Sequence, residues 1–228
     1  MTSIEIENKL KRVCEPDFKE KYVRFGINAK NALGVRHPQI KNLAKEIGTD
    51  HSLAIILSDH PMHEVRLLSP LIADSTLLTE NEADHWVSTF YSWDLVDNAC
   101  SLFAGTPFAF DKALEWCKSN EEFVRRSGLV TLVAITVHDK KAEDDHIRSF
   151  LEIAERYAFD DRNFVKKAVN WLIRQVGKRN LHLNQQAIEV AERLSYLPLK
   201  SAQWIAKDAL RELKSDAVKE RLLKKVKK

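Results

Sequence analysis

The scarcity of helix-breaking residues limits what this chain can fold into. Six glycines and six prolines occur in 228 residues, well below the usual shares of about 7% and 5%. β-Sandwiches and barrels need many tight turns, and tight turns depend on these residues. With 44% hydrophobic and 30% charged residues, the chain has the balance of a folded domain rather than a disordered one. The composition therefore predicts long helices.

Apolar residues recur at helical spacing along most of the chain. A first segment runs from Pro38, a favoured helix start, to Gly48, a favoured helix end. No alternation of apolar and polar residues flanked by hairpin turns indicates a strand. We expect helices over residues 37–48, 51–57, 62–73, 80–91, 93–103, 107–118, 121–137, 143–158, 161–177, 183–194, 201–213 and 216–226.

The connections between these segments are short, and no linker rich in Ser, Gly or Pro interrupts them. Short connections predict antiparallel helix pairs, and stacked pairs of about 40–47 residues are typical of HEAT repeats. We therefore expect an all-α fold, an α-solenoid of antiparallel helix pairs (HEAT-like repeats), that forms a single domain over residues 1–228.

The formal net charge of +3 hides an asymmetry along the chain. Residues 162–228 carry 17 Lys and Arg against 6 Asp and Glu, a net of +11, whereas residues 1–161 carry a net of −8. A local basic excess is the footprint expected for a polyanion partner, and it predicts a concave basic groove. A solvated helical surface is the alternative interpretation.

Three cysteines, Cys14, Cys100 and Cys117, form no CxxC pair and leave one thiol over in any disulfide scheme. This usage favours a reducing compartment. The first residues lack the apolar core of a signal peptide, and no run of about 18 apolar residues occurs. We expect a cytoplasmic, nucleoid-associated protein that does not enter a membrane.

One stripe in the basic part of the chain combines cations with a tryptophan. Lys167, Trp171, Arg174 and Lys178 stand at i, i+4, i+7 and i+11, so they line one side of a helix. Cations hold phosphates, and an aromatic plane can meet a base or a sugar, so the stripe predicts DNA binding by these side chains together with Arg179. The alternative is a partly buried tryptophan covered by lysine stems.

A second candidate site lies at the start of the helix expected over residues 93–103. Trp93 and Asp97 stand four residues apart and share a helix face. Ser92 suits an N-cap position and Asp94 complements the helix dipole, so neither needs a functional role.

Arg126, at the rim of a very apolar helix, needs a carboxylate or phosphate partner, and Asp97 is a candidate. An ion pair that only holds two helices together is the alternative.

Familiar catalytic and metal-binding patterns are absent from the sequence. No GxxxxGK[ST], GxGxxG or GxSxG motif occurs. His63-Glu64 is not followed by a histidine at position 67, so a zincin site is excluded, and we expect His60 and His63 at the surface. The sequence predicts neither a metal nor a cofactor.

Four segments together resemble the AlkD-like DNA alkylation repair family of HEAT-like-repeat DNA glycosylases, which remove alkylated purines. The resemblance extends from about residue 20 to about residue 215, and the order and spacing of the segments carry it. The segments are Ala32-Leu33-Gly34-Val35 followed by Pro38, SWDLVD at 92–97, Phe123–Arg126 with the helix after it, and NFVKKAVNWLIR at 163–174.

The resemblance implies a site and an activity. It places Trp93, Asp97, Arg126 and Trp171 at the family's lesion-site positions, and Phe25 where the family has a tyrosine. It implies a monofunctional glycosylase that hydrolyses the N-glycosidic bond of N3- or N7-alkylated purines in duplex DNA, and we expect it to act as a monomer. A non-catalytic protein that binds damaged or branched DNA, and a protein–protein scaffold, are the alternatives.

Overall fold

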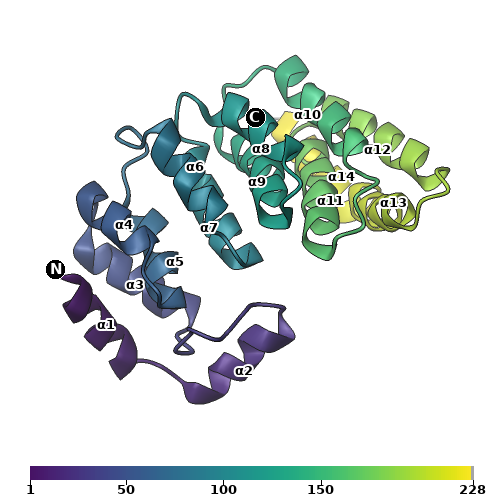
Figure 1. The fold of residues 1–228 in the computed structure, drawn as a ribbon. Helices are drawn as coiled ribbons and strands as arrows, with labels where there is room; N and C mark the ends of the chain where they lie inside the picture. The colour runs from purple at the N-terminus through teal and green to yellow at the C-terminus, as the bar shows by residue number, and fades with distance from the viewer. Residues whose placement is uncertain (227–228) are drawn as a thin grey trace. The chain divides into compact units, whose positions relative to one another are not determined.

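The computed structural model describes residues 1–226, and every regular element in that range is an α-helix (Figure 1). The all-α prediction is confirmed. The chain forms two compact units, Met1–Ala109 and Phe110–Lys228. A single domain over residues 1–228 stays a prediction.

Each unit consists of helices joined by short connections. The first contains α1 (Ser3–Arg12), α2 (Pro16–Arg24), α3 (His37–Ile47), α4 (His51–Ser58), α5 (His63–Ile72), α6 (Glu80–Ser88) and α7 (Trp93–Phe103). The second contains α8 (Ala109–Lys118), which begins at the boundary, α9 (Glu122–His138), α10 (Asp144–Arg156), α11 (Asn163–Gly177), α12 (Leu181–Ser195), α13 (Lys200–Leu213) and α14 (Asp216–Val226).

All the helices predicted from apolar periodicity form, and every end except that of α6 lies within two residues of its prediction. The structure also contains α1 and α2, whereas no helix is predicted from the sequence before residue 37. Both had recognisable start signals. Thr2 and Glu5 form a capping box, in which the Glu5 amide donates to Thr2 Oγ1 at 3.3 Å, and Pro16 occupies the first position of α2.

Both units arrange their helices in rows. In the first, α5 packs against α3 on one side and α7 on the other, and α4 covers it. In the second, α11 packs between α9 and α13, while α10 and α12 form a second layer. Residues 125–136 of α9 are all buried, and most of them are apolar or small. A helix segment that is buried around its whole circumference belongs inside a core.

The approach of α8 to α9 depends on a glycine. A Cβ atom added to Gly128 would lie 2.5 Å from the Ala113 carbonyl oxygen and 2.6 Å from Cys117 Sγ. No real Cβ atom tolerates such distances, so this position in α9 requires glycine despite its low helix propensity.

A fully buried carboxylate organises the irregular segment between α2 and α3. Glu64 on α5 accepts hydrogen bonds from the backbone N–H groups of Leu33, Gly34 and Val35, at 3.0, 2.8 and 3.1 Å to Oε1. Gly34 has a φ of +92°, and a Cβ there would lie 2.4 Å from the Glu15 carbonyl oxygen. The segment is therefore fixed by a charged acceptor and by a glycine that no other residue can replace without strain.

In the second unit, Asp160 is buried between Arg125, in the first turn of α9, and Arg162, the N-cap residue of α11. Arg125 donates to Asp160 Oδ2 at 2.5 Å, and Arg162 donates to both carboxylate oxygens, at 2.9 and 2.5 Å. Burial raises the pKa of Asp160, but the hydrogen bonds from Arg162 and Arg125 outweigh it, so its pKa lies below the ordinary value of 3.8.

We predict that Glu64→Gln lowers the free energy of unfolding by about 2 kcal/mol, the usual size for hydrogen bonds to a charged group. The amide keeps one acceptor oxygen but turns an N–H₂ group toward backbone donors. Urea unfolding measures the loss. Glu20→Gln, at an exposed site on α2 with only a 3.9 Å contact to Arg24, serves as the control and should stay within about 0.5 kcal/mol of wild type. Equal stability of the two variants would contradict the role given to Glu64.

We predict a pH-dependent loss of stability through Asp160. Because its folded pKa is lowered, its contribution is complete above the unfolded value and disappears as pH falls through the folded value. Asp160→Asn should be less stable than wild type by about 2–4 kcal/mol at pH 7, and the difference should shrink below about pH 3.8. Unfolding curves at several pH values measure it, with the exposed neighbour Asp161→Asn as control. A difference that is constant with pH would contradict the prediction.

Candidate functional site

A pocket of about 520 Å³ opens in the first unit beside the start of α7. Its wall is largely apolar and aromatic, with Phe18 and Tyr22 from α2, Phe25 just after α2, and Trp93 from α7. Asp97 lies in the same wall. The volume and the apolar lining are typical of a small-molecule or nucleobase pocket. We call it the Trp93 pocket.

Two contacts of its indole ring hold Trp93 in place. Its indole Nε1 donates to the Phe25 carbonyl oxygen at 2.9 Å, and its ring packs against the buried cluster of Tyr22, Ile27, Ala29 and Ala32. Phe25 itself is 61% exposed and lines the pocket. The structure therefore brings Trp93, Asp97 and Phe25, three residues singled out in the sequence, to one pocket.

The nearby tyrosine cannot supply the hydroxyl that Phe25 lacks. Tyr22 is buried, and its hydroxyl donates to the Val35 carbonyl oxygen at 2.6 Å. Burial, followed by the charges of Glu64 and Asp94, raises the pKa of this phenol. Tyr22 thus has a structural hydrogen bond and presents only its ring to the pocket.

The two carboxylates of the Trp93 pocket differ in their surroundings. Asp94 Oδ2 lies 2.8 Å from Nε2 of the fully buried His63, whose Nδ1 lies 3.0 Å from the Tyr91 hydroxyl. Ser92 donates to Asp94 Oδ1. Burial raises the pKa of Asp94, but His63 and Ser92 outweigh it and hold the pKa below its usual value. Asp94 is thus an ionised structural group, and Asp97, one turn further along α7, is the second carboxylate in the pocket wall.

This network corrects one expectation about the histidines. From the sequence we expect His63 at the surface, but its exposed fraction is 0%. An aspartate on α7, distant in sequence, accepts its ring N–H and makes burial possible. His60 is partly buried and lies 3.0 Å from Glu7.

The basic stripe of α11 divides into two halves. Lys167 is exposed, and Trp171 is partly exposed with no hydrogen-bond acceptor for its indole N–H among residues 1–226. Arg174 and Lys178 instead contact acidic residues of α13. Arg174 Nη1 lies 3.1 Å from Asp208, and Lys178 Nζ lies 2.6 Å from Glu212. Binding of DNA by Arg174 and Lys178 stays a prediction, since local carboxylates already neutralise both charges.

The two other arginines named in the sequence contact backbone carbonyl groups. Arg126 is 4% exposed, and its Nη1 donates to the Phe164 carbonyl oxygen on α11 at 2.6 Å. Arg179 donates to the carbonyl oxygens of Thr136, in the last turn of α9, and of Asp139 and Ala142 just after it, at 2.7–3.0 Å. Asp97 belongs to the first unit and Arg126 to the second, and a contact between them stays a prediction, as do the catalytic roles of Trp171 and Arg126.

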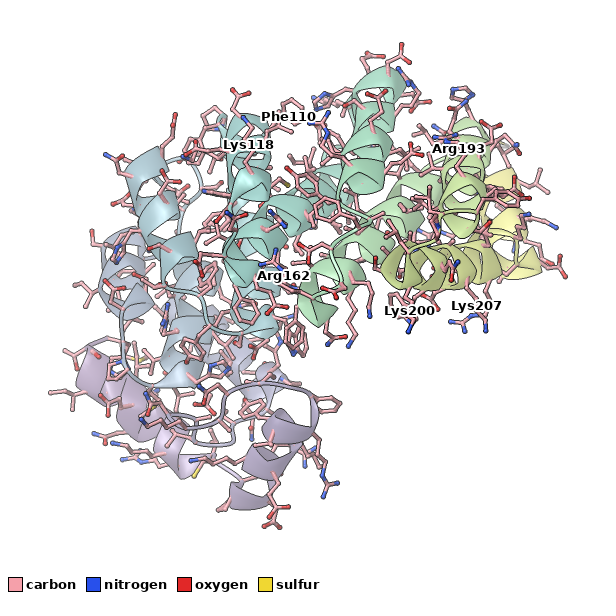
Figure 2. The ribbon with its side chains drawn as sticks, turned by 45° about the vertical axis from the view of Figure 1, so that its right-hand side comes forward. Phe110, Lys118, Arg162, Arg193, Lys200 and Lys207 are labelled. Carbon is pink, nitrogen blue, oxygen red and sulfur yellow. The ribbon has the colours of Figure 1, made fainter. Side chains whose placement is uncertain are left out.

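A second stripe of cations and tryptophan on α13 was missed by the sequence analysis. Lys200, Trp204, Lys207 and Arg211 repeat the i, i+4, i+7, i+11 spacing of the α11 stripe, which is the signal that could have found them. Trp204 is 40% exposed, and Lys166 Nζ of α11 lies 5.0 Å above its ring. Figure 2 shows the side chains of Lys200 and Lys207 projecting from the same side of α13.

Lys200 and Lys207 have no ion-pair partner in the part of the chain that the structure describes, so their charges are open to an external anion. Residues 1–226 contain no group of three His, Cys, Asp or Glu side chains arranged to hold a metal ion. Within the same residues, no helix combines the length and apolar content needed to cross a bilayer.

Comparison with known proteins identifies the family. A family model described as DNA alkylation repair enzyme matches residues 6–214. No curated protein matches the sequence.

Two solved structures are among those that resemble the chain. One is described as belonging to a new family of proteins related to the HEAT-like repeat DNA glycosylases with affinity for branched DNA structures. It has a TM-score of 0.78 at 20% identity and covers 93% of this chain and 95% of its own. A designed armadillo repeat protein has a TM-score of 0.41 at 16% identity, covering 77% and 86%. The first confirms the HEAT-like fold. The match to the family model extends over most of the sequence, and the chain belongs to the DNA alkylation repair enzyme family.

Proposed function

We propose that this protein is a DNA glycosylase that excises cationic N3- or N7-alkylated purines from duplex DNA. The observation that carries the proposal is the Trp93 pocket, where an aromatic wall and the carboxylate of Asp97 meet in about 520 Å³. An aromatic face attracts a cation, and a carboxylate stabilises developing positive charge, so the pocket suits a planar cationic base attached to a sugar.

The chemistry of the substrate explains why so few catalytic groups are needed. A purine alkylated at N3 or N7 is already cationic, and it leaves neutral when the C1′–N bond breaks and the electron pair departs with the base. No strong acid has to protonate the leaving group. Water then adds to C1′ and loses a proton to solvent, giving free base and an abasic site.

Asp97 would act on the charge that accumulates on deoxyribose. As the base departs, positive charge moves from the purine to C1′ and the ring oxygen, and a nearby carboxylate stabilises it and can orient the attacking water. Trp93, fixed by its hydrogen bond to the Phe25 carbonyl, would offer its π face to the cationic nucleotide, worth about 0.5–2 kcal/mol. Phe25, exposed at the same pocket, would add a second aromatic surface.

The second unit would supply contacts to the DNA. Exposed cations on α11 and α13, Lys167, Lys200 and Lys207, suit phosphate groups. Trp171 and Trp204, both partly exposed, suit contacts to a sugar or a base. Arg126 would bind a phosphate group. Arg174, Lys178 and Arg179 complete the proposed DNA-binding set, although their present partners are within the protein.

We predict that Asp97→Asn lowers the release of 7-methylguanine from duplex DNA by about 10²–10³-fold, the usual cost of removing one electrostatic stabiliser of a transition state. The substitution preserves shape, so binding of the same duplex should remain. Single-turnover measurement of free base, with binding measured in parallel, separates chemistry from affinity. Asp17→Asn, at an exposed site on α2, makes the same change in charge and should behave as wild type.

Two results would overturn the catalytic proposal. One is wild-type protein that releases neither 7-methylguanine nor 3-methyladenine above background. The other is Asp97→Asn that releases base as fast as wild type.

We predict that replacing Lys200 and Lys207 by Gln weakens binding to undamaged duplex DNA and reduces the slope of log K against log[salt] by about 2, because each phosphate contact contributes about 0.9. Fluorescence anisotropy at several salt concentrations measures both quantities. Lys118→Gln with Lys224→Gln removes the same charge from exposed positions on α8 and α14 and serves as control. An unchanged slope in the α13 variant would exclude these lysines from the DNA contact.

A non-catalytic DNA-binding function is the second candidate, favoured by the description of the structure with the same fold as a protein with affinity for branched DNA. It predicts salt-sensitive binding without base release, and tighter binding to a four-way junction than to a duplex of equal length. A scaffold for other proteins predicts instead that the Lys200 and Lys207 variant binds DNA as wild type does.

A further inference from the structure

A second pocket lies in the second unit, at the C-terminal ends of α9 and α11 and beside α14. Its volume is about 470 Å³, and it has no large aromatic side chain in its wall. Cations dominate its lining, with one carboxylate, Asp144. The cations are Lys140, Lys178, Arg179, Arg221 and Lys225. We call it the Arg221 pocket.

Some of these cations have a structural role at the ends of helices. Arg179 donates to three carbonyl oxygens in the last turn of α9 and just after it. Lys225 Nζ donates to the carbonyl oxygens of Lys178 and Arg179, at 3.0 and 2.9 Å, and Lys140 donates to that of Val137. Carbonyl groups satisfy N–H donors and interact favourably with a cation, but they have no net charge to neutralise it.

Carboxylates offset only part of the charge. Glu212 lies 2.6 Å from Lys178, and Asp144 lies 4.0 Å from Arg179. Asp144 also accepts a hydrogen bond from the Asn180 amide at 2.7 Å. No carboxylate of residues 1–226 lies within ion-pair distance of Lys140, Arg221 or Lys225. The pocket therefore has a clear excess of positive charge.

The excess of positive charge affects the Lys225 ammonium group. Burial lowers the pKa of its ammonium group, and the charges of Arg221, Lys140 and Arg179 lower it further. Like charges crowded in a half-enclosed space are the electrostatic condition that a bound anion relieves.

A helix start contributes in the same direction. Asn180 lines the pocket and is the N-cap of α12, a helix of 15 residues. The N-terminus of a helix carries a partial positive charge, and helix starts with nearby cations commonly bind phosphate. The cation cluster and the helix start are independent features that meet at one cavity.

We propose that the Arg221 pocket is a binding site for a phosphate group. Lys140 and Arg221 would bind the anion directly, since both are exposed and lack a carboxylate partner, while Arg179 and Lys225 would hold the walls of the site and contribute charge. The site is separate from the Trp93 pocket and does not depend on base release. The phosphate belongs either to a DNA strand or to a small free anion.

The test uses the full chain and inorganic pyrophosphate, a compact polyanion. Wild type should bind it at one site by isothermal titration calorimetry at constant ionic strength. Lys140→Gln with Arg221→Gln should weaken binding by about tenfold or more, the size expected for lost charge-assisted contacts. The control pair Lys118→Gln and Lys224→Gln lies outside the pocket and should bind as wild type does.

Weaker binding by the pocket variant should not reflect unfolding, because both substituted side chains are exposed. The thermal unfolding temperature should change little. Absence of pyrophosphate binding by wild type would overturn the proposal. Equal binding by the pocket variant and the control pair would overturn it as well.

Three further comparisons identify the source of the phosphate, and each supports the site. Tighter binding of a 5′-phosphorylated duplex than of its 5′-hydroxyl form, lost in the pocket variant, indicates a terminal phosphate. Equal binding of the two forms, weakened in the variant, indicates a backbone phosphate. Pyrophosphate binding that leaves DNA affinity unchanged indicates a small free anion. Base release measured on the pocket variant reports on glycosylase activity separately from phosphate binding. Failure of the phosphate site and failure of the proposed glycosylase can therefore be told apart.

Discussion

The buried carboxylate of Glu64 is the interaction on which the first unit depends. A fully buried charge is costly unless it is hydrogen-bonded, and here the backbone N–H groups of Leu33, Gly34 and Val35 provide the bonds. Those bonds fix the segment between α2 and α3, which has no regular secondary structure. Val35 in turn accepts the Tyr22 hydroxyl, which holds α2 against the same segment. The position of Tyr22 in the aromatic wall of the Trp93 pocket therefore depends on the hydrogen bonds of the Glu64 carboxylate.

The neighbouring residue extends this arrangement to α7. His63 precedes Glu64 at the start of α5 and lies between Tyr91 and Asp94, so the beginning of α7 is tied to α5. Trp93 lies between these two anchored residues and donates to the Phe25 carbonyl. A rigid aromatic side chain at the rim of a pocket suits the proposed contact with a planar base, because little conformational freedom remains to be lost on binding. Asp97 follows one turn later on the same anchored helix.

Much of the fold and part of the site could be predicted from sequence. Apolar periodicity located α3 to α14 because each of these helices buries one face or, for residues 125–136 of α9, every side. It missed α1 and α2, whose cues are a capping box at Thr2 and a proline at position 16. The pairing of Trp93 with Asp97 followed from their spacing of four residues. The partners of Arg174 and Lys178 did not, because Asp208 and Glu212 are more than 30 residues away and nothing in the α11 sequence records them.

The sequence by itself determined that this chain is helical, that its last third is basic, and that it belongs to a family of DNA alkylation repair enzymes. These properties depend on local periodicity, on counted charge and on ordered motifs, all of which can be read along the chain. Tertiary structure decided where each charge lies and what surrounds it. It places Asp94 against His63 and Asp97 in the wall of the pocket, and it neutralises Arg174 while leaving Lys200 and Lys207 exposed. Electrostatic interactions act through space over a few ångströms, so only the packing of distant segments decides which carboxylate meets which cation.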